Sequence, residues 1–136
     1  MFVDTWALRA IMDKHDRNHA KALRLRRELE QAGRRWVMTT WILVEFLGGA
    51  ARPPHRSVAA AFVKQLAADP DTTVLSASQT DYEAGFALYE SRPDKSWSLV
   101  DCISILVCQR LGITQVFSGD HHFEQAGLML VSPASE

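Results

Sequence analysis

The sequence has 136 residues, of which 47% are apolar, enough for one well-buried core and too few residues for two ordinary domains. With 15 basic and 16 acidic side chains, its formal net charge is −1, so no whole-molecule field draws the protein onto nucleic acid. A polyanionic ligand would therefore need a local basic patch or a bound cation.

Short β-like runs alternate with longer helical segments along the chain. Strands are predicted at five apolar runs: 2–3, 36–38, 73–76, 115–117 and 129–131. Helices are predicted at six longer segments: 5–15, 17–32, 41–47, 57–68, 79–91 and 99–111. This alternation predicts an α/β fold with a short central parallel β-sheet flanked by helices on both faces. The breaks between segments are too short for linkers, so we expect one domain over 1–131 and a loose C-terminal tail over 132–136.

The cysteines and the apolar runs predict where the protein resides. Cys102 and Cys108 lie six apart in one apolar run and face different sides of a helix, which excludes a disulfide between them. Two buried free thiols suit a reducing cytoplasm. No apolar run approaches the roughly 18 residues of a membrane span, and the N-terminus has no basic region followed by an apolar stretch. We expect a cytoplasmic protein that makes no membrane contact.

Two acidic residues directly follow predicted strands. Asp4 comes after the first strand, and Asp120 comes after the strand at 115–117. Ligands of open α/β sheets bind beyond the carboxyl ends of the strands, where both acids are expected to lie. Each acid taken alone also fits a helix N-cap, which stabilises a helix by roughly 1 kcal/mol. For Asp120, the capped helix would be short and would stop near Gly127.

Two further acids interrupt apolar helices. Glu45 is the only charged residue of TTWILVEFLGGA, and a helix that is apolar all round is expected to be buried. A carboxylate isolated there would be costly without a compensating partner, although an exposed, narrow polar stripe is an alternative. Asp101 begins another apolar helix and forms a capping pattern with Ser98. Capping and cation binding are compatible at that position, because the helix dipole favours a carboxylate there.

Together these positions place four carboxylates at one edge of the sheet. Their mutual repulsion would be severe without cations. Ligand sets made only of oxygen suit Mg²⁺ or Mn²⁺ better than zinc. The sequence therefore predicts a site for Mg²⁺ or Mn²⁺.

The ordered motifs resemble those of the PIN-domain ribonucleases, and within them the VapC-like toxins of bacterial type II toxin–antitoxin pairs. The resemblance runs from MFVDTWAL through TTWILVEFLGG to DKSWSLVDCISILVCQRLGITQVFSGDHHFEQAGL and covers nearly the whole chain. It implies a single PIN-like domain with four catalytic, metal-binding acids: Asp4, Glu45, Asp101 and Asp120. Thr5 and Ser118 match positions where the family often has a hydroxyl that supports the acids, although Ser118 stands where Thr is common.

The resemblance implies an endoribonuclease dependent on Mg²⁺ or Mn²⁺, which hydrolyses RNA phosphodiester bonds by means of a metal-activated water. Its implied partners are the RNA substrate and a co-encoded antitoxin whose tail covers the acidic site. The resemblance does not decide whether the protein forms a homodimer or whether its site holds one metal ion or two. A housekeeping PIN nuclease of RNA processing and a catalytically silent PIN-like binding protein are the alternatives. A receiver-like phosphotransfer module is disfavoured, because TVLSAS offers no Asp after the third strand.

The histidines and arginines are given other roles. His122, next to His121, matches a family position where packing or substrate contact is expected rather than metal ligation. His15 and His19 could share a helix face, but no third ligand lies near them in the sequence. The basic stretch ALRLRRELEQAGRRW predicts a solvated helix face, with phosphate contact from its last two arginines, Arg34 and Arg35, as the minority alternative.

Overall fold

The computed structural model describes residues 1–132 and contains a single sheet of five parallel strands in the order β3-β2-β1-β4-β5. The strands are β1 (Phe2–Val3), β2 (Trp36–Thr39), β3 (Thr72–Leu75), β4 (Gln115–Phe117) and β5 (Met129–Val131). The helices are α1 (Thr5–Met12), α2 (His19–Gln31), α3 (Thr40–Gly49), α4 (His55–Ala68), α5 (Gln79–Ser91), α6 (Leu99–Leu111) and α7 (His122–Gln125).

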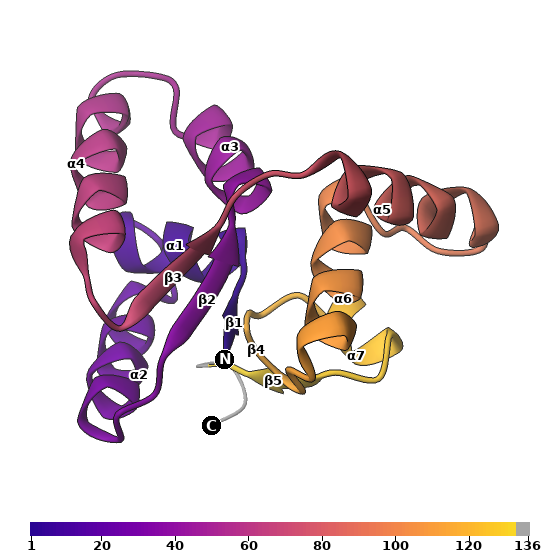
Figure 1. The fold of residues 1–136 in the computed structure, drawn as a ribbon. Coiled ribbons are helices and arrows are strands. Elements are labelled where there is room, and N and C mark those ends of the chain that lie inside the picture. Colours follow the sequence, from indigo (N-terminus) through magenta and orange to yellow (C-terminus); the bar gives the residue numbers. More distant parts are fainter. Residues whose placement is uncertain (133–136) are drawn as a thin grey trace.

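Helices cover both faces of the sheet. Figure 1 shows α1, α2 and α4 on one side of the strands and α6 and α7 on the other, with α5 packed on α6 and reaching away from the sheet. The predicted α/β class, the parallel sheet and the helices on both faces are confirmed. None of the helices in residues 1–132 is long and apolar enough to cross a membrane.

The shortest strand occupies the centre of the sheet. β1 pairs with β2 and with β4, so that Phe2 lies opposite both Val37 and Val116. Phe2 and Val3 are fully buried, as expected of a strand that is covered on both faces. The chain leaves β1 toward β2 and leaves β4 in the opposite direction, toward β5. The carboxyl ends of β1 and β4 therefore form a topological switch point, where α/β proteins bind their ligands.

Most predicted boundaries agree with the structure to within two residues, and α1 shows why one does not. The helix ends at Met12 instead of residue 15. The carboxylates of Asp13 and Asp16 accept hydrogen bonds from the backbone N–H groups of His15 and Asn18, two residues further on. These local turns compete with helical hydrogen bonding and delay the start of α2 to His19.

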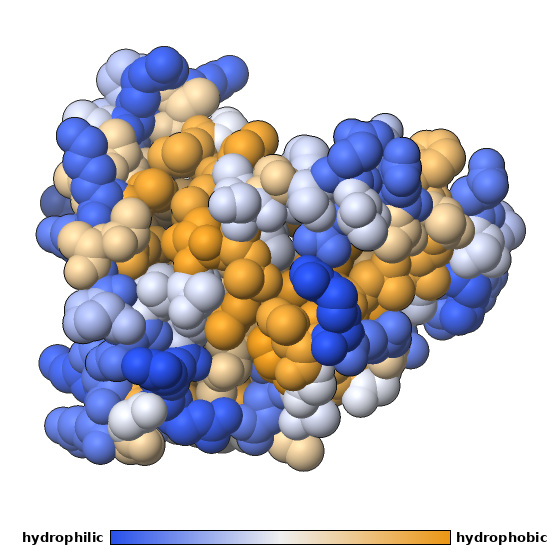
Figure 2. Space-filling view, viewed as in Figure 1, coloured by the Kyte–Doolittle hydropathy of each residue, from blue (hydrophilic) through white to orange (hydrophobic). Residues whose placement is uncertain are grey.

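The expectation that the helix around Glu45 is buried on every side is wrong. In α3, Ile42 and Phe46 are buried, but Val44 is 61% exposed and Leu47 is 38% exposed. The helix packs against α1, α4, β2 and α6, but the side that carries Val44 and Leu47 stays exposed. Figure 2 shows apolar residues gathered over the middle of the molecule, between α4 and α6 in this view. The apolar residues of this helix therefore form an exposed surface on one side and part of the core on the other.

The cysteine prediction is confirmed, and the tail is only partly described. Cys102 and Cys108 are both free and buried, and burial raises the pKa of the Cys108 thiol to about 12. Of the predicted tail at 132–136, only Ser132 is described, and it is buried. The other four positions lie outside the described residues.

Candidate active site

Asp4 lies at the switch point and is held from two sides. It caps α1, since its Oδ2 accepts a hydrogen bond from the backbone N–H of Trp6 at 3.3 Å. The same oxygen accepts a hydrogen bond of 2.9 Å from the hydroxyl of Ser118, which follows β4. Its own backbone N–H donates to the carbonyl of Phe117 at 3.2 Å. The capping role and the predicted position beside a hydroxyl are therefore both present.

The surroundings of Asp4 disfavour its charged form. Its side chain is only 4% exposed, and burial raises its pKa from 3.8 to about 7. The nearby charge of Asp101 raises the pKa further, while the hydrogen bond from Ser118 opposes both effects. Two acids from opposite ends of the chain are thus close enough to repel each other.

Glu45 joins the site through the residue next to Asp4. The hydroxyl of Thr5, at the start of α1, donates a hydrogen bond of 2.6 Å to Oε1 of Glu45. Glu45 is half-buried and not completely buried. The contact with the Thr5 hydroxyl is what distinguishes it from an ordinary surface acid. Both residues predicted to support the acids, Thr5 and Ser118, therefore donate to a carboxylate of the predicted set.

Asp101 begins the buried helix α6. Its backbone N–H donates to the Ser98 hydroxyl at 3.0 Å, and its Oδ2 accepts from the Ser98 backbone N–H at 3.0 Å, which completes a capping box. The side chain is buried, as the apolar sequence beyond it predicted. The box fixes one carboxylate oxygen and turns the group toward the switch point.

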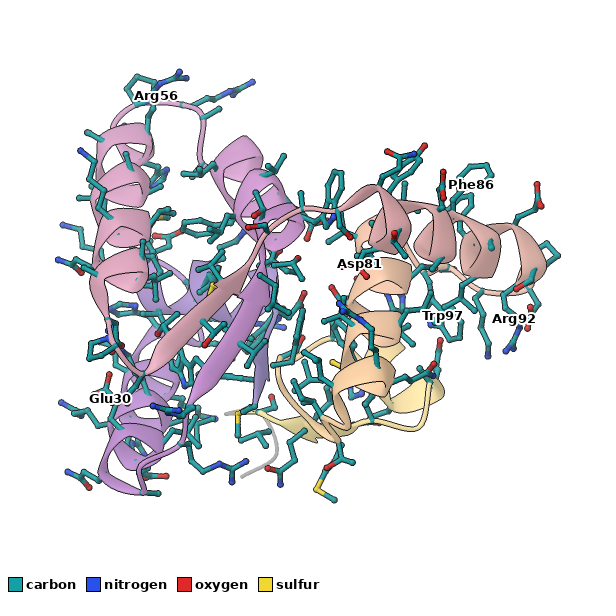
Figure 3. The ribbon with its side chains drawn as sticks, in the orientation of Figure 1. Glu30, Arg56, Asp81, Phe86, Arg92 and Trp97 are labelled. Carbon is teal, nitrogen blue, oxygen red and sulfur yellow. The ribbon has the colours of Figure 1, made fainter. Side chains whose placement is uncertain are left out.

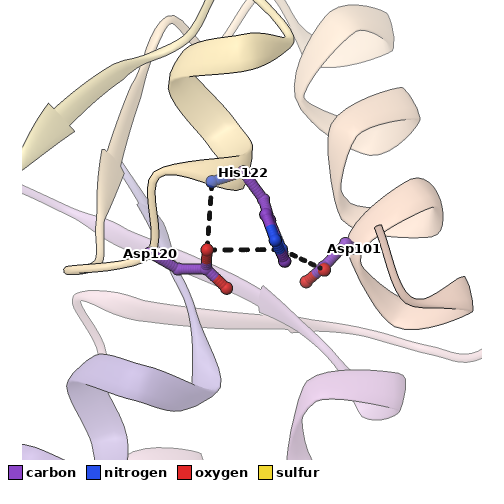
Figure 4. Close-up of side chains that lie close together, drawn as sticks. All are labelled: Asp101, Asp120 and His122. Carbon is purple, nitrogen blue, oxygen red and sulfur yellow. Dashed lines mark hydrogen bonds and ion pairs between the residues drawn. The ribbon is translucent and has the colours of Figure 1, made fainter. Parts of the chain in front are cut away.

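Asp120 lies in the turn between β4 and α7, and His122 is the first residue of α7. The Ser118 hydroxyl accepts a hydrogen bond of 3.0 Å from the backbone N–H of Asp120, and Asp120 Oδ1 accepts one of 3.0 Å from the backbone N–H of His122. Nδ1 of His122 lies 3.1 Å from Oδ2 of Asp101 and 3.3 Å from Oδ1 of Asp120. Figure 4 shows the imidazole ring between the two carboxylates.

These three residues form the tightest group of ligand-type side chains in residues 1–132. Asp101, Asp120 and His122 each offer one atom, and these atoms all lie within 4.8 Å of one another. For His122 the sequence predicted packing or substrate contact and not metal ligation, and in the structure its ring contacts two of the predicted acids. The sequence feature that could have predicted this contact is the position of His122 two residues after Asp120, since the turn into α7 brings the two side chains together. At hydrogen-bond distance from two carboxylates, an Nδ1–H group donates to them and holds them together.

The oxygens that stay unpaired test whether this site fits a divalent cation. Within residues 1–132, no hydrogen-bond donor approaches Oε2 of Glu45, Oδ1 of Asp101 or Oδ2 of Asp120. Within the described residues, the buried side-chain N and O atoms without a partner are Trp41 Nε1 and Ser104 Oγ, so these three carboxylate oxygens are accessible from solvent and free to meet a cation. The carboxylate of Asp4, whose pKa is raised by burial and by Asp101, lies beside these oxygens. Together the carboxylates form the oxygen-rich donor set that Mg²⁺ and Mn²⁺ prefer. The residues fit the predicted metal, and their roles as ligands stay predictions.

An open parallel sheet with carboxylates gathered at its switch point defines an α/β protein with an acidic site at the carboxyl edge. A sequence model of the PIN domain matches residues 1–128, and the chain belongs to the PIN-domain family. Among solved structures, the chain is similar to Mycobacterium tuberculosis VapC20, described as a sarcin–ricin loop cleaving toxin. The TM-score is 0.81 at 22% sequence identity, over 94% of this chain and 95% of that chain. A search of curated proteins finds no significant match.

Proposed function

We propose that this protein is an endoribonuclease that hydrolyses RNA phosphodiester bonds with Mg²⁺ or Mn²⁺. The observation that carries the proposal is the acidic group at the switch point: Asp101 and Asp120 meet at His122, Asp4 lies near enough to Asp101 for its pKa to respond, and Glu45 accepts from Thr5 beside Asp4. Membership of the PIN-domain family supports it. The metal would be held by four carboxylates: Asp4, Glu45, Asp101 and Asp120.

A bound cation would lower the pKa of a water molecule and offset the charge that develops on the phosphoryl oxygens. The protein side chains orient the ligands. Ser118 and Thr5 direct the carboxylates of Asp4 and Glu45, and Ser98 directs that of Asp101. His122 keeps the carboxylates of Asp101 and Asp120 together. Such preorganisation would fix the carboxylates in place before a cation and the substrate bind.

We propose the toxin of a bacterial type II toxin–antitoxin pair as the cellular role, with a cognate antitoxin as partner and the cytoplasm as location. The structural likeness to a toxin over nearly the whole of both chains supports it. The exposed side chains of Val44, Leu47 and Phe86 offer apolar surface that a homodimer or the antitoxin would cover. A housekeeping PIN nuclease shares the same site and differs in its cellular effect.

Cleavage of single-stranded RNA tests the nuclease proposal. The purified protein should cut RNA with Mg²⁺ or Mn²⁺ and stop when EDTA is added. Asp101→Asn should abolish cutting, because it keeps the size and the cap of Asp101 but removes the charge that would bind metal. Asp71→Asn is the matched control, since Asp71 is exposed just before β3, at the amino end of that strand and away from the acids. Equal activity of wild type and Asp101→Asn would contradict the proposal.

Growth of a bacterium tests the toxin role. Expression of the protein alone should stop growth, and Asp101→Asn should not. A small neighbouring open reading frame should restore growth when co-expressed, and its product should co-purify with the protein. Cutting of RNA in vitro without growth arrest would favour the housekeeping nuclease.

A further inference from the structure

A pocket of about 540 Å³ lies beside the acidic site, between the end of α5 and the start of α6. Its lining combines the ring of Tyr89, the charges of Arg92 and Lys95, and the residues Trp97 and Ser98 at the entry to α6. Figure 3 shows Arg92 and Trp97 together below the outer end of α5. We call it the α5–α6 pocket.

The α5–α6 pocket and the acidic site share a wall. Ser98 lines the pocket, and its backbone N–H and hydroxyl are the groups that hold Asp101. The adjacent Trp97 is only 6% exposed, and its indole N–H donates a hydrogen bond of 3.1 Å to Gln125 of α7. Because α7 also carries His122, a ligand in the pocket would lie next to a group bound at the acids.

The chemistry of the lining fits an anion attached to an aromatic ring. The guanidinium carbon of Arg92 lies 5.3 Å from the centre of the Trp97 ring, and Nζ of Lys95 lies 5.6 Å from it. Two cationic side chains thus lie near one buried ring, whereas the lining contains a single acidic side chain, Glu90. Arg92 also makes two hydrogen bonds to Asp94, from Nε at 3.0 Å and from Nη2 at 2.9 Å, which leaves Nη1 of Arg92 and the ammonium of Lys95 to contact a phosphate.

Tyr89 supplies the aromatic surface. Its side chain is 51% exposed at the last turn of α5, whereas Trp97 is covered and serves as a wall. An exposed ring beside cations is the combination that binds single-stranded nucleic acid, where bases stack on aromatic side chains and phosphates contact basic ones. A base paired within a duplex could not enter a pocket of this kind.

We propose that the α5–α6 pocket binds one nucleotide of single-stranded RNA next to the phosphodiester bond at the acidic site. In this arrangement Tyr89 stacks on the base, and Lys95 and Arg92 contact its phosphate. The proposal rests on the proposed ribonuclease function. It adds a subsite that sets how a single strand lies across the acids.

Binding of a fluorescently labelled oligouridylate, in EDTA so that the strand stays intact, tests the pocket. Tyr89→Ala should weaken binding about tenfold, the size expected for one stacked base, and Lys95→Ala should also weaken it because a phosphate contact is lost. Lys95→Ala should also reduce the slope of log affinity against log salt by about 0.7, the value for one phosphate contact on a single strand. In cleavage assays both variants should raise KM and leave kcat unchanged.

Phe86→Ala is the matched control, because Phe86 is an exposed aromatic residue one turn earlier on α5 that stacks on Tyr82 and does not line the pocket. In wild type, the indole N–H signal of Trp97 should shift on titration with the oligonucleotide, a measurement that needs no variant. Equal affinities for all three variants and wild type, or an unmoved Trp97 signal, would overturn the proposal and leave the pocket to a protein ligand. Wild type that binds RNA through the pocket but never cuts it would instead overturn the nuclease function.

Discussion

The hydroxyl of Ser118 lies 2.9 Å from Oδ2 of Asp4 and joins two residues that are 114 positions apart in the chain. The same hydroxyl accepts the backbone N–H of Asp120 at 3.0 Å. One side chain therefore ties the end of β1 to the turn after β4. This contact exists because β1 and β4 are neighbours in the sheet, and it keeps a carboxylate in place despite its burial.

Replacing Asp4 should change how stability depends on pH. Its pKa is 3.8 when unfolded and about 7 when folded, so between these values the folded protein holds a proton that the unfolded chain has released. This contribution to stability is complete below pH 3.8 and is lost as the pH rises through about 7. In EDTA, the free energy of unfolding of wild type should fall across this window by on the order of a few kcal/mol relative to Asp4→Asn.

Urea denaturation at a series of pH values measures this difference. Asp4→Asn should match wild type at acidic pH and exceed its stability above neutral pH, because Asn keeps the cap on α1. Asp94→Asn should keep the wild-type dependence over the same window, since the hydrogen bond from Arg92 lowers the pKa of Asp94 to about 2. Parallel curves for wild type and Asp4→Asn would show that Asp4 ionises normally.

Divalent cations should stabilise the folded protein. Millimolar Mg²⁺ or Mn²⁺ should raise the melting temperature of wild type, because a cation that binds only the folded site stabilises it by mass action and relieves carboxylate repulsion. Asp101→Asn should lose most of this shift, and Asp94→Asn should keep it. Scanning calorimetry in metal and in EDTA makes the comparison, and a wild-type melting temperature that ignores both additions would count against the metal site.

The placement of acids at strand ends could be predicted from the sequence because it depends on local order along the chain. Asp4 and Asp120 follow short apolar strands, and Asp101 begins an apolar helix after a capping serine. Glu45 was included in the same set as the one charged residue of an apolar helix, and the resemblance to PIN domains implied the same role for it. The structure brings the hydroxyls of Thr5 and Ser118 to this set as expected.

The remaining features depend on tertiary packing, which the local pattern does not contain. A strand of two residues, β1, gives no sign that it is the centre of the sheet. The exposure of Val44 depends on which side of α3 meets α1 and α4. The position of His122 depends on the turn after β4 and on where α6 begins, two segments whose distance in space cannot be read from spacing.

His122 should act on the geometry of the acids and not on the chemistry of cleavage. His122→Gln should lower the rate of RNA cutting, since it loosens the hold on Asp101 and Asp120. The products should keep the 5′-phosphate and 3′-hydroxyl ends that attack by a metal-bound water leaves. End-labelling of the cut RNA reads this out, and cyclic phosphate ends that persist in EDTA would transfer the activity to histidine chemistry.

Replacing Gly119 with a larger residue should destabilise the protein, because the Trp6 ring lies against it. A Cβ at position 119 would come within 2.3 Å of the Trp6 ring, so Gly119→Ala must move the ring or the turn that carries Ser118 and Asp120. We expect a loss of about 1–3 kcal/mol in unfolding free energy, the usual result of overpacking, together with slower RNA cleavage. Trp6→Ala removes the ring, so Gly119→Ala should lower the unfolding free energy far less in the Trp6→Ala background than in wild type.

Gly48→Ala is the control, because a Cβ there meets no atom within 4 Å and the substitution should raise the unfolding free energy by about 0.5–1 kcal/mol. Urea denaturation and cleavage rates of the four members of the cycle measure the coupling, and an equal cost of Gly119→Ala in both backgrounds would show that Trp6 does not position the turn.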